Sequence, residues 1–233
     1  GNMAQQALVV LFLLGASTVA VKAQSDSVYH SLVAQAGFYH LQKDYQNAII
    51  AYEQAFQLKQ PDALNAYKAA GAYSLAHDVD KALFYIDKAL RSGWTEADWL
   101  ANDPDFNYVR ESAPHQWKKV VQASLLKEKA YEQTLKLPAL RRRINLMGLK
   151  DQTLRYQRIQ ARDDHERKLI NSLIRKADSA NLGHGKEIIK KYGWPRLSEI
   201  GKDGQNNLWL IVQHADQDVL FQQIALDSMK NLI

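Results

Sequence analysis

The stretch "WLIVQHADQD", residues 209–218, holds the side chains best suited to chemistry. An imidazole near a carboxylate can move protons, so Gln213, His214 and Asp216 are candidate catalytic residues. On a helix, residues two positions apart point to different sides, which separates His214 from Asp216. Gln213 and Asp216 share a stripe with Trp209 instead. We therefore expect the partner of His214 to come from another helix, unless the helix ends before Asp216.

Two further candidates, Asp151 and Arg155, stand one helical turn apart with the acid first, which favours an ion pair. If this pair is exposed, it stabilises the helix by only about 0.3–0.5 kcal/mol. Combined with His214 across helices, it would form the polar cluster of a hydrolase-type enzyme. The other interpretations of His214 are a structural histidine, a metal ligand, or a member of a buried polar cluster that sets helix register.

Motifs that identify a metal or cofactor site are missing from the sequence. It contains no HExxH and no cysteine, so the common zinc patterns are excluded. The segment "GHGKE", residues 183–187, lacks the earlier glycine and the following Ser or Thr of a phosphate-binding loop. No GxSxG elbow occurs. We expect no metal and no cofactor.

The composition indicates an all-α fold. The 233 residues include only 11 Gly and 5 Pro, and Ala, Leu, Gln and Lys are abundant. The net charge of +5 falls largely between Lys118 and Lys191, with Arg141-Arg142-Arg143 as its densest run. Acidic residues are interspersed there. We interpret the basic run as a solvated helical face and expect no nucleic-acid partner.

The N-terminal segment resembles a secretory signal. An apolar run from Ala7 to Val21 is shorter than a membrane span, and Val21-Lys22-Ala23 offers small residues before a cleavage site at Gln24. We expect residues 1–23 to be a signal peptide, the mature protein to be periplasmic or secreted, and no stable membrane span after cleavage. A buried core helix and an uncleaved anchor are the alternatives.

A period of 34 residues organises the next segment. Three small or aromatic residues recur at this spacing, as Tyr39/Tyr73, Ala48/Ala82 and Ala55/Ala89. Each copy consists of two helical stretches around a polar turn, which predicts stacked helical hairpins. The alanines would lie where the two helices of a hairpin cross closely.

At these positions residues 27–94 resemble the tetratricopeptide repeat. The first copy matches the family pattern at Leu32, Ala36, Tyr39, Ala48, Tyr52, Ala55 and Pro61. The second copy departs from it, with Ile86 at the aromatic position and Trp94 at the proline position. A degenerate third layer would follow up to residue 123, with Asp103 and Asp105 as caps rather than calcium ligands.

The resemblance implies a groove that binds a peptide or a partner protein through side chains of the first helix of each hairpin. The residues expected in this role are Gln35, His40, Asn65 and Lys68. The implied architecture of residues 24–123 is an α-α superhelix.

Residues 124–233 predict long amphipathic helices. Pro138 suits the first turn of one helix, Gly148 is a possible kink, and Asp163 a possible new start. The segments "MGLKDQTLR" (147–155), "GWP" (193–195) and "WLIVQHADQDVLFQ" resemble an uncharacterised bacterial helical domain family without an established activity. The polar residues that match it are Asp151, Gln152, Arg155, Gln213, His214, Asp216 and Gln222. Members usually continue with further helices, so we expect this domain to be incomplete.

The functional expectation is an exported tetratricopeptide-repeat protein that binds a protein or peptide, with a C-terminal helical domain of unknown role. The alternatives are the hydrolase-type enzyme around His214, and a structural module in which both halves form one solenoid.

Overall fold

The structure, a computed structural model, describes the backbone of residues 2–232 and the side chains of residues 21–232. Helices account for 83% of the chain, and the described residues contain eleven α-helices and no strand. The predicted all-α class is confirmed. The predicted signal peptide lies almost entirely outside the described side chains. Within the described residues, no helix combines the length and the apolarity needed to cross a bilayer.

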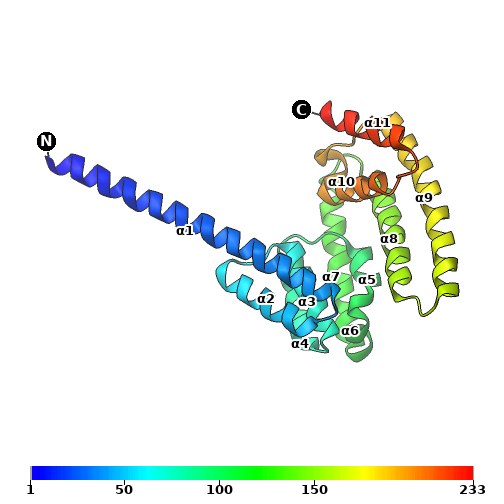
Figure 1. Cartoon of the computed structure of the whole chain (residues 1–233), viewed down its shortest axis with the longest axis horizontal. Helices are drawn as coiled ribbons and strands as arrows, with labels where there is room; N and C mark the ends of the chain where they lie inside the picture. The colour runs from blue at the N-terminus through cyan, green and yellow to red at the C-terminus, as the bar shows by residue number, and fades with distance from the viewer. Residues whose placement is uncertain (1, 233) are drawn as a thin grey trace. The chain divides into compact units, whose positions relative to one another are not determined.

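The chain forms two compact units (Figure 1). Unit 1 comprises residues 1–94 and 103–123, and unit 2 comprises residues 95–102 and 124–233. Unit 1 contains α1 (Asn2–Leu41), α2 (Tyr45–Leu58), α3 (Ala63–Leu75), α4 (Val79–Arg91), the 3-10 helix η1 (Pro104–Phe106), α6 (Asn107–Ser112) and the first half of α7 (Pro114–Glu132). The segment 95–102, which follows the second hairpin, belongs to unit 2.

The hairpins α1–α2 and α3–α4 repeat each other in backbone geometry at a spacing of 34 residues. Lys43 and His77 both adopt a positive φ, of 61° and 66°. The next residue in each turn, Asp44 or Asp78, caps the following helix by accepting a hydrogen bond from the amide three residues on. Because the positive-φ residue and the capping aspartate both recur at the 34-residue period of the sequence, the packing is compatible with a helical repeat. The superhelical path stays a prediction.

Small residues allow the helices of unit 1 to approach closely. Ala48 and Ala82, and likewise Ala55 and Ala89, are fully buried. Trp94, at the position where the family pattern has proline, stacks on Tyr67 with ring centroids 3.8 Å apart. Both rings belong to the second hairpin, and Tyr67 also meets Phe106 of the third layer edge to face, with ring centroids 5.4 Å apart.

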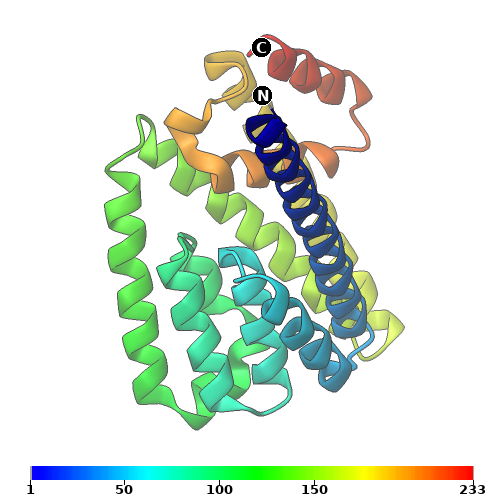
Figure 2. The ribbon, with the colours of Figure 1, turned by 90° about the vertical axis from the view of Figure 1, so that its left-hand side faces the viewer.

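Unit 2 is built from the second half of α7, α5 (Ala97–Asn102), α8 (Pro138–Gln160), α9 (Asp164–Tyr192), α10 (Leu197–Gln213) and α11 (Val219–Lys230). Figures 1 and 2 show α8 and α9 side by side, joined by a short turn, and α10 packs along the first part of α8 and also contacts α9. The apolar core includes Ile144, Ile188, Trp194, Leu208 and Phe221. As predicted, Pro138 opens α8 and Asp163 caps α9.

Gly148 does not end α8, which continues to Gln160. Its role is close packing, because a Cβ added at Gly148 would lie 2.3 Å from Oδ1 of Asn207. The Asn207 amide cannot easily move away, since it donates to Glu96 (3.0 Å) and to Asn145 (2.8 Å). A glycine is needed where α10 crosses α8.

We expect Gly148→Ala to lower the free energy of unfolding by about 1–3 kcal/mol, because the methyl group would displace Asn207 from its hydrogen bonds. Gly183→Ala is the matched control. Gly183 lies inside α9 with open space where a Cβ would stand, so alanine should stabilise by about 0.5–1 kcal/mol there. Urea unfolding measures both changes, and equal stability of the two variants would contradict the packing role of Gly148.

Candidate functional site

His214 lies at the end of α10 and contacts a carboxylate on α8. Residue 214 is the C-cap of α10, and its Nδ1 lies 2.9 Å from Oδ2 and 3.1 Å from Oδ1 of Asp151. The carboxylate of Asp151 is buried, with 2% of its side chain exposed, whereas the imidazole is 25% exposed. The buried acid therefore orients a partly exposed imidazole.

Arg155 and Asp178 complete the cluster. The Arg155 Nε donates to Oδ1 of Asp151 (3.2 Å), and its Nη2 donates to both oxygens of Asp178 (3.0 and 3.1 Å). Asp178 lies on α9, so three helices contribute to one group of charges. The ion pair of Asp151 and Arg155 is thus not the exposed surface pair that its helical spacing alone indicates.

The two carboxylates of the cluster differ electrostatically. Burial alone would raise the pKa of Asp151, but the hydrogen bond and charge of His214, with Arg155, lower it below its ordinary value. Burial raises the pKa of Asp178, and the guanidinium of Arg155 only partly offsets this. Asp151 is therefore the more firmly ionised of the two.

Of the five candidate catalytic residues, the structure brings together Asp151, Arg155 and His214. Gln213 and Asp216 are exposed, and neither is recorded in a side-chain contact with the cluster. Asp178 was not predicted from the sequence. Its signal was an acidic residue on the stripe of buried side chains along α9, four positions after Ile174 and one after Ala177.

Three polar pairs join α8 to α10 in one register: Arg141–Asp203, Asn145–Asn207 and Asp151–His214. The partners are 62, 62 and 63 residues apart in sequence. Because residue numbers rise together on both helices, α8 and α10 run in the same direction. We call these three pairs the polar seam.

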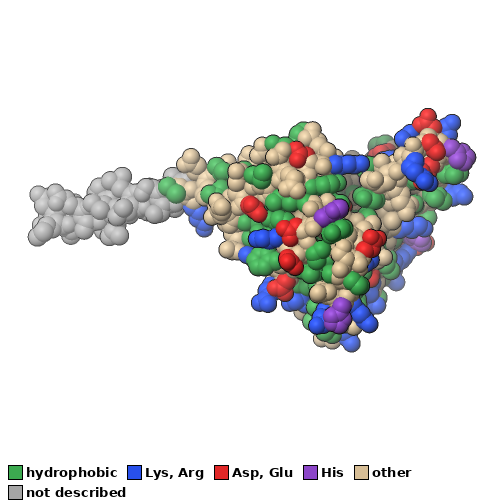
Figure 3. Space-filling model, turned by 90° about the horizontal axis from the view of Figure 1, so that it is seen from below, with side chains coloured by type: hydrophobic (Ala, Val, Ile, Leu, Met, Phe, Trp, Pro, Cys, Tyr) green, Lys and Arg blue, Asp and Glu red, His purple; other side chains and the backbone are tan. Residues whose placement is uncertain are grey.

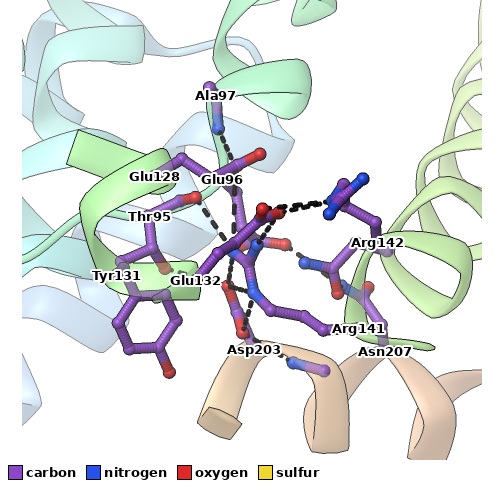
Figure 4. Close-up of polar contacts among 12 residues, drawn as sticks. Thr95, Glu96, Ala97, Glu128, Tyr131, Glu132, Arg141, Arg142, Asp203 and Asn207 are labelled. Carbon is purple, nitrogen blue, oxygen red and sulfur yellow. Dashed lines mark hydrogen bonds and ion pairs between the residues drawn. The ribbon is translucent and has the colours of Figure 1, made fainter. Parts of the chain in front are cut away.

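Arg141 anchors one end of the polar seam (Figure 4). Its side chain is fully buried, so the interpretation of the basic run as a solvated face is wrong at this residue. The guanidinium donates to Asp203 through Nε (3.1 Å), to Glu132 (3.3 Å) and to the carbonyl oxygen of Thr95 (3.0 Å). Glu128 lies 3.7 Å away and also accepts from the amide of Ala97. A single positive charge thus holds segments from four parts of unit 2.

A small cavity, with room for about one water molecule, opens beside this network. Its lining includes Glu96, Trp99, Asn145 and Asn207. Burial, with the negative charge of Asp203, raises the pKa of Glu96 to about 7, although the Asn207 amide and Arg141 act in the opposite direction. The charge of Glu96 therefore changes near neutral pH.

Of the four residues of unit 1 that are predicted to contact a peptide, two contact other side chains of the unit and two are exposed. His40 lies 3.1 Å from Oδ2 of Asp105, and Asn65 donates to the hydroxyl of Tyr29 at 3.3 Å. Gln35 and Lys68 are exposed. On the face of the molecule shown in Figure 3, basic, acidic and apolar side chains are interspersed.

Asp103 caps η1, as predicted, whereas the side chain of Asp105 contacts His40. Oδ1 of Asp103 accepts from the amide of Asp105 (3.0 Å), and Oδ2 accepts from the hydroxyl of Tyr67 (2.7 Å). Burial and the neighbouring Asp105 raise the pKa of Asp103 to about 6. These bonds attach the third layer to α3.

We expect Arg141→Met to lower the free energy of unfolding by about 3–5 kcal/mol, because it leaves buried carboxylates without their cation. Arg141→Lys keeps the charge but cannot reproduce the forked contacts, so it should still lower the free energy of unfolding more than the control variant described next. The control is Arg143→Met, which removes an exposed arginine of the same helix paired with Glu187 and should cost under about 1 kcal/mol. Similar losses of unfolding free energy for Arg141→Met and Arg143→Met, measured in urea, would contradict the role of Arg141 as the anchor of the polar seam.

The raised pKa of Glu96 predicts a stability that depends on pH. Since the folded value of about 7 exceeds the ordinary 4.5, the protonated form stabilises the fold. This contribution is fully present below about pH 4.5 and is lost as the pH rises through 7. In the wild type, the free energy of unfolding should fall by roughly 2 kcal/mol between pH 5 and pH 8 because of Glu96, and Glu96→Gln should remove this fall. Thermal and urea unfolding across this range test it. Glu187→Gln, on the surface, should keep the wild-type dependence of stability on pH. The same dependence in Glu96→Gln would contradict the raised pKa of Glu96.

Comparison of the chain with protein-family models, with curated proteins and with solved structures gives no match. The tetratricopeptide resemblance of residues 27–94 therefore depends on the residue pattern and on the 34-residue recurrence of the turn geometry.

Proposed function

We propose that unit 1 is a tetratricopeptide-like module that binds an extended, acidic and apolar peptide segment of a partner protein. The observation that carries the proposal is the surface of α3. This central helix is buried at residues 66, 67 and 69–74, but Leu64 and Lys68 remain exposed, with 51% of Leu64 accessible. They stand one turn apart on the same side of the helix.

The chemistry of this surface indicates the kind of peptide. The Lys68 ammonium would bind a carboxylate, while Leu64 would pack against an apolar side chain next to it. Gln35, exposed on α1, can hydrogen-bond to a peptide backbone. His40 and Asn65 are held by Asp105 and Tyr29, so they would form fixed edges of the site rather than flexible arms.

The proposed location follows from the N-terminal apolar run. Residues 7–21 with the small residues before Gln24 support export, so the partner would be a periplasmic or extracellular protein. The hydrolase-type alternative depends on unit 2. It is supported by the contact between His214 and Asp151, which is the arrangement that orients a general base.

Selection of short random peptides on the immobilised full-length chain tests the binding proposal. The selected peptides should be enriched in Asp or Glu beside an aliphatic or aromatic residue, and their affinity should fall with salt. Lys68→Glu should weaken them by about tenfold or more, equivalent to about 1.4 kcal/mol. Lys118→Glu, the same charge change at an exposed position of α7, should leave the affinity unchanged. Equal binding to both variants would refute the role of α3.

A further inference from the structure

Asp151, Asp178 and His214 each offer one ligand atom, and these three atoms lie within 4.8 Å of one another. The geometry points to a binding site for a divalent transition-metal ion held by these three side chains. The site lies wholly within unit 2, so it is independent of peptide binding by unit 1. No closely spaced motif in the sequence indicates this site, because its ligands come from three helices.

The ligand set selects the class of ion. Two carboxylate oxygens and one imidazole nitrogen suit Zn²⁺, Mn²⁺, Fe²⁺ or Co²⁺, whereas Mg²⁺ and Ca²⁺ favour oxygen alone. Three protein ligands leave at least one coordination position for water. The 25% exposure of His214 and the 17% exposure of Asp178 give an ion a route to the site.

The ligands are held before an ion arrives. Asp151 is almost fully buried on α8, and its Oδ2 accepts a hydrogen bond from Nε2 of Gln152 (2.9 Å). Asp178 follows the buried Ala177 on α9. His214 is positioned by the C-terminal turn of α10, whose neighbouring Ala215 belongs to the core of unit 2. Outer contacts of this kind orient metal ligands and strengthen binding.

Arg155 supplies positive charge to the cluster. Its guanidinium bridges Asp151 and Asp178 and keeps two like-charged carboxylates together. A divalent ion would take over this role with twice the charge. Because the side chain is long and 21% exposed, Arg155 can turn towards solvent when the ion binds. Arg155 therefore competes with the metal.

Bound metal would also give the hydrolase alternative a source of activated water, since such an ion lowers the pKa of its water ligand. The binding inference does not depend on that activity. Its failure would leave the contact between His214 and Asp151 as a structural or proton-transfer pair.

The test uses the untagged full-length protein after removal of metals with a chelator. Isothermal titration with Zn²⁺ and Mn²⁺ should give one saturable site. Co²⁺ should produce visible absorption bands that saturate at one equivalent, as direct evidence of protein ligands. Metal at about a hundred times Kd should raise the Tm by roughly 5–10 °C.

Variants of the site distinguish it from adventitious binding. His214→Ala and Asp178→Asn should each weaken binding at least tenfold and abolish the Co²⁺ bands. Arg155→Gln, which removes the competing cation, should keep or tighten binding. His184→Ala, at an exposed position of α9, is the control and should bind as the wild type does. Circular dichroism spectra establish that each variant is folded. The inference is overturned by a lack of saturable binding, or by affinities that His214→Ala and Asp178→Asn leave unchanged.

Discussion

The burial of the Arg141 charge is the constraint on which unit 2 depends. A guanidinium without solvent contact is tolerated only when carboxylates and carbonyls replace its water. Here the replacements come from three separate places, namely the segment before α5, α7 and α10. None of these segments can shift along α8 without uncovering the charge. The interaction therefore acts less as a source of net stability than as a specification of which segments meet.

The register that Arg141 sets extends along the whole contact between α8 and α10. Arg141 and Asp151 are ten residues apart, so the two ends of the polar seam lie about 15 Å apart along the helix. Asn145 and Asn207 form the middle pair, and Gly148 allows Asn207 to approach. With Arg141 on Asp203, an in-register helix pair brings His214 to Asp151. The structural contact between Arg141 and Asp203 thus positions the contact between His214 and Asp151, which is the one suited to chemistry.

The features that the sequence predicted are those encoded locally. The 34-residue period, the capping aspartates and the start of α8 at Pro138 each depend on neighbours within a few residues. The helical wheel separated His214 from Asp216, but α10 ends at Gln213, so the wheel does not describe the position of Asp216. The burial of Arg141 could not be predicted, because its run of three arginines is typical of a solvated face and its main partner lies 62 residues away. Asp178 was missed for a related reason, since its partner Arg155 lies on another helix.

The two ends of the polar seam differ in a way that bears on function. A polar cluster that only sets helix register is most stable when it is fully buried, because solvent weakens its electrostatic interactions. The Arg141 end meets that condition, with a fully buried guanidinium. The His214 end does not, because α10 stops at Gln213 and leaves the imidazole, Arg155 and Asp178 partly open to solvent. A register role explains why Asp151 is buried there, but it does not explain why three ionisable partners surround it at the surface. The excess of polar groups at the open end is the feature that calls for a ligand.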